Sequence, residues 1–168
     1  MNKLLRILKH RWLDKGDARR ALGPGALARI EERVKASERH HSGEIRVCVE
    51  AGLPLSYLWR NASARERAVT MFGKLRVWDT AHNNGVLIYL LLADHAIEIV
   101  ADRGLNERVS AVQWKALLAG MSAQFKAGHF EAGLMAAVDA VDALLAQHFP
   151  LAPGADNPNE LPDAAVLK

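Results

Sequence analysis

The feature that most constrains the fold is the longest apolar run, Gly85–Ala93, which reads GVLIYLLLA. Apolar residues at consecutive positions indicate a strand that is covered on both faces. A reversal follows at Ala93–Asp94, and Ile97 and Ile99 then alternate with other residues. The pattern therefore predicts a β-hairpin with arms at residues 85–92 and 95–102, the first arm lying in the middle of a sheet.

One further strand and several helices are predicted around this hairpin. Residues 44–50, EIRVCVE, have the period of a strand. Apolar residues at helical spacing, separated by Gly, Pro and Asn-Gly breaks, predict helices at 3–13, 25–39, 62–75, 111–126 and from 130 to about 149. Because a helix joins the first strand to the hairpin, those two strands should be parallel with a right-handed crossover. The order predicts an α/β fold, a three-layer α/β/α sandwich around a small mixed sheet.

Charge and composition divide the chain into three parts. Residues 1–20 are predicted to be a basic amphipathic N-terminal helix, with seven basic and two acidic residues, whereas the rest of the chain has a net charge of −2. Residues 21–149 form the folded domain, and residues 150–168, with four prolines, form an extended tail. The sequence shows no secretory signal, no long apolar span and one cysteine, Cys48, so a cytoplasmic location is expected.

The N-terminal helix is a candidate binding element. Its apolar residues Leu4, Leu8 and Trp12 recur at helical spacing, and Arg11 is among the basic residues between them. This pattern has three interpretations: the helix packs on the body, it binds a protein partner or a second copy of the chain, or it lies on an anionic membrane surface. Nucleic acid is not an expected partner, because the body of the chain is not basic.

The hairpin also gathers polar residues at one end of the sheet. Asp102, after the second arm, returns beside the start of the first arm, close to Asp79 and Asn84. The residues expected beside them are Thr80, Asn83, Arg103, Asn106, Ser42, Gly43 and Glu44. Oxygen ligands suit a hard cation, so Asp79, Asn84 and Asp102 are candidate ligands for calcium or magnesium. The alternative is that these residues only shape turns and cap helices.

The opposite end of the sheet holds fewer acidic residues. Glu50 ends the first strand and Asp94 lies in the hairpin reversal, so the two could form a second, sparser site. Turn chemistry alone also explains an aspartate at position 94.

Three segments together resemble the TPM domain: HHSGEIRVCVE from His40, TAHNNGVLIYLLLADHAIEIVADRGLNERV from Thr80, and FKAGHFEAGLMAAVDAV from Phe125. The resemblance covers about residues 26–149. It implies an α/β/α fold with a central sheet of about four strands, and it brings with it the acid phosphatase activity and divalent-cation binding described for some members. Asn106 stands where many relatives have an acidic residue after a Gly-Leu pair.

Two functions follow from these observations. The first is a binding or accessory module with a weak divalent-cation site, because no nucleophile–base pair is recognisable in the sequence. The second is a metal-assisted acid phosphatase, in which the cation would polarise a phosphoryl oxygen.

Overall fold

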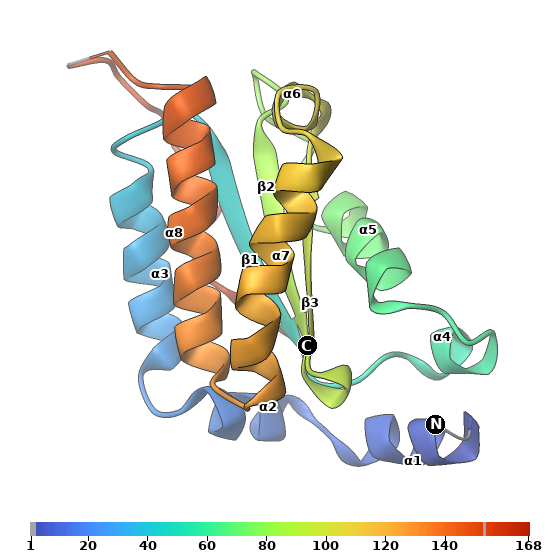
Figure 1. Cartoon of the computed structure of the whole chain (residues 1–168). Coiled ribbons are helices and arrows are strands. Elements are labelled where there is room, and N and C mark those ends of the chain that lie inside the picture. Colours follow the sequence, from blue (N-terminus) through green and yellow to red (C-terminus); the bar gives the residue numbers. More distant parts are fainter. Residues whose placement is uncertain (1–2, 153) are drawn as a thin grey trace.

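A four-stranded sheet in the order β3-β2-β1-β4 is the middle layer of the structure, a computed structural model that describes residues 3–152 and 154–168 (Figure 1). The strands are β1 (Glu44–Glu50), β2 (Gly85–Leu91), β3 (Ala96–Ala101) and β4 (Val166–Leu167). β1 is parallel to both β2 and β4, whereas β2 and β3 form an antiparallel hairpin. The predicted parallel pair and the predicted hairpin are therefore confirmed.

Helices cover both faces of this sheet, which confirms the three-layer α/β/α fold (Figure 1). The helical segments are α1 (Lys3–Trp12), α2 (Lys15–Leu22), α3 (Ala26–Ser37), α4 (Leu55–Trp59), α5 (Ala64–Lys74), η1 (Leu92–Asp94), α6 (Arg103–Asn106), α7 (Ala111–Lys126) and α8 (Phe130–His148). α3, α7 and α8 lie together over one face, while α5 lies on the other.

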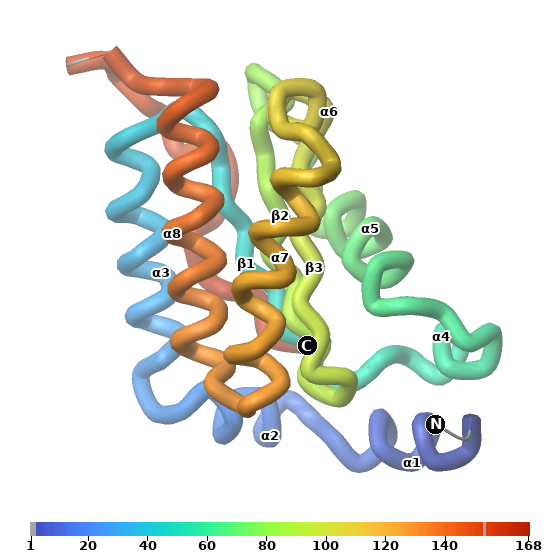
Figure 2. Tube along the Cα trace, in the orientation of Figure 1, coloured from blue at the N-terminus to red at the C-terminus, as the bar shows by residue number. Residues whose placement is uncertain are grey.

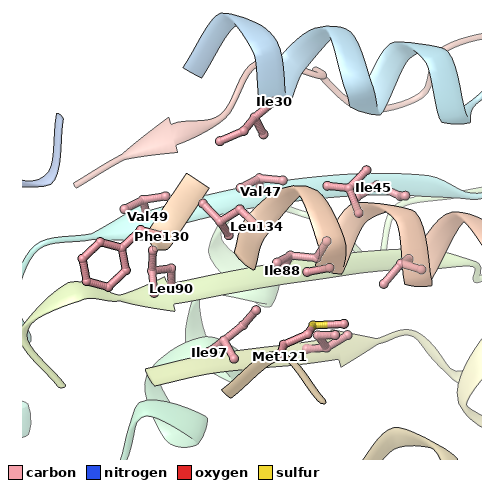
Figure 3. Close-up of a cluster of buried hydrophobic side chains, with 14 of the residues drawn as sticks. Ile30, Ile45, Val47, Val49, Ile88, Leu90, Ile97, Met121, Phe130 and Leu134 are labelled. Carbon is pink, nitrogen blue, oxygen red and sulfur yellow. The ribbon is translucent and has the colours of Figure 1, made fainter. Parts of the chain in front are cut away.

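The two core clusters follow from the alternation of side chains along each strand. Val47 and Ile88 point into the larger cluster, under Ile30 of α3 and Leu134 of α8 (Figure 3). Their neighbours along the strands point to the opposite face, beneath α5, and include Cys48, Leu87 and Tyr89. All seven residues of β2 are buried, as the unbroken apolar run predicts.

Several short elements are absent from the sequence-based prediction, among them α2 and β4. The described part of residues 1–20, predicted as one helix, is divided between α1 and α2, because Asp14 and Asp17 form a capping box that starts α2. α2 buries Ala18 and Leu22 in the larger core cluster. The extended tail ends in β4, which pairs with β1 and is the fourth strand of the sheet.

The tail is held along β1 by side chains as well as by the strand ladder (Figure 2). Arg46 donates hydrogen bonds to the carbonyl groups of Pro162 and Ala164. Glu44 accepts two from the backbone N–H groups of Glu160 and Leu161, at 3.1 and 3.3 Å. In the described residues, no helix is both long enough and apolar enough to cross a bilayer.

Candidate functional site

The polar end of the sheet is built from the loops on either side of the hairpin, next to α6 (Figure 1). The N–H of Asp102 donates to the carbonyl of Gly85 at 2.8 Å, so the end of β3 lies beside the start of β2. The N–H of Gly104 donates to the carbonyl of Asn83, also at 2.8 Å. The structure therefore places Asp102 at the start of the Gly85 strand.

Asn84 occupies the most enclosed position at this end, with no exposed surface. Its Nδ2 donates to the carbonyl of Ser42 at 3.1 Å, and its backbone N–H donates to Oγ1 of Thr80 at 3.1 Å. The side chain thus joins the loop before β1 to the loop before β2. Its remaining oxygen, Oδ1, is buried and has no hydrogen-bond partner within the described part of the chain.

Asp102 caps α6 with one carboxylate oxygen, and its other oxygen takes no part in the cap. Oδ1 accepts the N–H of Arg103 at 2.7 Å, which is the capping role that the alternative interpretation assigns to it. Oδ2 is buried and, like Oδ1 of Asn84, has no hydrogen-bond partner among residues 3–152 and 154–168. Capping therefore accounts for only half of this carboxylate.

The other predicted members of the polar end are engaged elsewhere. Asp79 is exposed and pairs with Arg76 at 2.7 Å. Oδ1 of Asn83 accepts from Arg103 at 3.1 Å, in a loop where Asn83 has a φ of 52°, typical of a turn. The carboxylate of Glu44 is bound to the tail.

The cation-binding capacity of this end is accordingly small. Two buried side-chain oxygens are free, one amide and one carboxylate, from Asn84 and Asp102. In the part of the chain that the structure describes, no three His, Cys, Asp or Glu side chains form a group that could hold a metal. The donor set fits a hard cation that keeps most of its water ligands, as Mg²⁺ commonly does.

At the opposite end of the sheet, Glu50 and Asp94 are each neutralised by a different part of the chain. Glu50 accepts two hydrogen bonds from Arg67, at 2.8 and 2.6 Å, and one from the hydroxyl of Tyr89 at 2.6 Å. Asp94 pairs with α1, where a hydrogen bond to His10 keeps its pKa below the usual range. These partners occupy the carboxylates of the predicted second site.

A third group of acidic residues, Glu38, Glu44 and Asp163, forms where the tail returns to β1. Burial and the nearby charges of Glu44 and Asp163 raise the pKa of Glu38 to about 8. Burial also raises the pKa of Glu44 to about 7, although it accepts two backbone hydrogen bonds. Asp163 accepts a hydrogen bond from Asn159 at 2.8 Å. No local signal predicts this group, because it forms only when the tail returns to β1.

The raised pKa of Glu38 makes stability depend on pH. In the folded state Glu38 keeps its proton up to about pH 8, whereas the unfolded chain releases it near the ordinary value of 4.5. The contribution of Glu38 to stability should therefore be fully present below pH 4.5 and be lost as the pH rises toward 8. We expect Glu38→Gln to flatten this decline and to raise Tm by a few degrees at pH 8.5. Melting followed by circular dichroism from pH 5 to 9 measures it.

Glu32→Gln is the matched control, because Glu32 is an exposed residue of α3, the helix that ends directly before Glu38. Its curve should follow that of the unmodified protein. Parallel pH profiles for Glu38→Gln and the unmodified protein would show that Glu38 does not hold the additional proton.

The four predicted partner-binding residues are all on α1 and all exposed. They are Leu4, Leu8, Arg11 and Trp12. The exposed fraction of Trp12 is 84%, the highest among the large apolar residues with substantial exposure.

The sheet order, the crossover through α5 and the polar loops at the start of β2 define a mixed-sheet α/β/α domain. The model of the TPM domain family matches residues 17–144, so the chain belongs to this family. Among solved structures, the chain is similar to the NMR structure of the BA42 protein from the psychrophilic bacterium Bizionia argentinensis. The two are 30% identical over 84% of this chain and 91% of that one, with a TM-score of 0.72. Comparison with curated proteins gives no match.

Proposed function

We propose that this TPM domain is a binding module that takes up Ca²⁺ or Mg²⁺ weakly at the polar end of the sheet. The observation that carries the proposal is the pair of buried oxygens, Oδ1 of Asn84 and Oδ2 of Asp102, which lack hydrogen-bond partners among the described residues. A buried polar atom without a partner costs on the order of 1–3 kcal/mol. A hydrated cation bound at either oxygen would supply its missing interaction.

The same donor set limits the affinity. Asp102 brings one free buried carboxylate oxygen, whereas tight calcium sites gather several carboxylates. Arg103 places a positive charge beside Asn83, which opposes a second one nearby. Asp79 is not among the proposed ligands, because its carboxylate is paired with Arg76.

Binding should appear as a small thermal stabilisation. A cation present at about tenfold above its Kd would add about 1.4 kcal/mol to the free energy of unfolding, if it binds only the native state. For a chain of this length that is a rise in Tm of a few degrees. We expect such a rise as MgCl₂ or CaCl₂ is increased at constant ionic strength, followed by differential scanning fluorimetry.

Asp102→Asn should abolish the rise in Tm while it leaves the stability of the cation-free protein almost unchanged. Asparagine caps helices as well as aspartate does, but it removes the charge. Asp79→Asn is the matched control and should keep the full rise. No rise up to several millimolar cation, or a rise that survives Asp102→Asn, would refute the cation site.

A metal-assisted phosphomonoesterase would draw on the same cation, so the two functions need a separate measurement. Burial raises the pKa of Cys48 to about 12, so this cysteine is no thiolate nucleophile at neutral pH. We expect para-nitrophenyl phosphate to be hydrolysed no faster than in buffer, with or without Mg²⁺, at acid and neutral pH. Hydrolysis that disappears in Asp102→Asn would replace the binding module by an enzyme.

A further inference from the structure

α1 is attached to the body through Ile7, which packs against the smaller core cluster, and through two polar side chains. His10 is 3% exposed; its Nδ1 accepts the N–H of Leu53 at 3.0 Å, and its Nε2 lies 3.0 Å from Oδ1 of Asp94. Arg6, one turn earlier, donates to Oδ2 of Asp94 at 3.1 Å and to the carbonyl of Ala62 at 2.9 Å. These contacts fix which side of the helix faces the sheet.

Apolar residues on the other side of α1, Leu5, Leu8 and Trp12, are exposed, whereas Ile7 packs against the smaller core cluster. Leu8 is two residues from both Arg6 and His10, which places it about 200° round the helix axis from each. Leu5 and Trp12 share its side of the helix at helical spacing, and all three are exposed, Leu8 by 55%. A surface helix of a globular domain normally does the reverse and buries its apolar side.

Basic residues border this apolar side. Lys9 and Arg11 are exposed and lie about 100° to either side of the row formed by Leu8 and Trp12. Lys15 and Arg19, at the start and in the last turn of α2, add two more exposed positive charges. An exposed apolar row bordered by Lys and Arg, with a tryptophan in it, is the pattern of a helix that lies in a membrane interface.

An open groove continues the apolar surface toward the body. It has a volume of about 620 Å³, and its apolar lining includes Leu8, Trp12, Leu92 and Phe130. Lys9, Arg20 and Asp17 also line it, and Asp17 pairs with Arg20, which leaves Lys9 as the basic residue of the lining without that partner. Apolar walls with cationic residues suit an amphiphile that has acyl chains and an anionic headgroup.

We propose that the α1 surface, formed by Leu5, Leu8, Lys9, Arg11 and Trp12, lies on an anionic lipid bilayer. The positive charge of residues 1–20 favours an anionic bilayer over a second copy of the chain. A second copy of the chain would bring two strongly basic N-terminal segments together in a symmetric contact, where they repel. A bilayer that contains anionic lipid instead attracts each Lys and Arg near its surface.

Flotation of the full-length protein with phosphatidylcholine vesicles, with and without about 30% phosphatidylserine, tests the proposal. We expect binding to the anionic vesicles, little to the neutral ones, and a decline as salt rises from about 0.1 to about 0.5 M. Lys9→Gln with Arg11→Gln should weaken binding by roughly 20-fold, since each basic residue contributes about fivefold. Leu8→Gln with Trp12→Gln should weaken it by at least about tenfold.

The matched control is Val112→Gln, which changes an exposed apolar residue of α7, outside the proposed surface. It should bind as the unmodified protein does, and circular dichroism should show that every variant is folded. Equal loss in the control would place the contact elsewhere. Absence of binding, or equal binding to neutral vesicles, would overturn the proposal. So would self-association in sedimentation experiments that Trp12→Gln abolishes, because that would make the surface a dimer interface.

Discussion

Arg67→Met should destabilise the protein by about 3–5 kcal/mol, because it leaves the carboxylate of Glu50 buried without a cation. Glu50 and Arg67 are 4% and 6% exposed, and the guanidinium donates two hydrogen bonds to the carboxylate. The carboxylate holds the pKa of Arg67 above its usual range. Methionine fills similar space and cannot supply charge, so the Glu50 carboxylate would keep only the hydrogen bond from the hydroxyl of Tyr89 among these three. Urea unfolding monitored by circular dichroism gives the change in free energy.

Arg60→Met is the matched control for this loss. Arg60 pairs with Glu66 at 2.7 Å, but both side chains are about half exposed, at 54% and 48%. Exposed pairs of this kind contribute about 0–1 kcal/mol. The double variant Arg67→Met with Glu50→Gln should recover part of the loss, since it removes the unpaired charge. Equal effects of Arg67→Met and Arg60→Met would show that water reaches Glu50 in the folded protein.

The sheet was the most predictable part of the fold because its signals are local. The apolar run of β2, the reversal before His95 and the alternation of β3 lie within one short stretch of chain. The parallel pairing of β1 with β2 then follows from the helix between them. By contrast, β4 has only two residues, and it forms because β1 offers a free edge more than a hundred residues away along the chain. Nothing within the tail itself indicates that edge.

The orientation of α1 could not be predicted for a related reason. The sequence shows an amphipathic helix, and burial of its apolar side is the ordinary expectation. The observed orientation depends on Asp94, which lies more than 80 residues after α1 in the sequence and pairs with both Arg6 and His10. Polar contacts between residues distant in the sequence thus determine which side of the helix is exposed to solvent.

The polar end of the sheet could be predicted only in part from the topology. The hairpin register was enough to place Asp102 beside Gly85, and the structure confirms that neighbourhood. Which carboxylate oxygens lack a hydrogen-bond partner depends on the other side chains and backbone groups that reach them. The spacing of residues in the sequence does not reveal those partners. Arg76 takes the carboxylate of Asp79, and the tail takes that of Glu44.

Gly85 is the residue on which this end of the sheet depends most, and Gly85→Ala should cost about 3 kcal/mol or more. A Cβ at this position would lie 2.0 Å from the carbonyl oxygen of Val77, a main-chain atom of a buried residue. Neither side can withdraw easily. Residue 85 pairs with Glu44 of β1, and its carbonyl accepts the N–H of Asp102.

The matched control is Gly73→Ala, because a Cβ at this position in α5 meets nothing within 4 Å. Alanine favours helix over glycine by up to about 1 kcal/mol, so this variant should be slightly more stable. Urea midpoints of the two variants therefore move in opposite directions. Because Gly85 is the first residue of β2 and directly follows Asn84, the alanine should also reduce the rise in Tm that a divalent cation produces. If Gly85→Ala unfolds at the midpoint of the unmodified protein, the loop of Val77 yields freely, and the close approach does not hold the polar end in place.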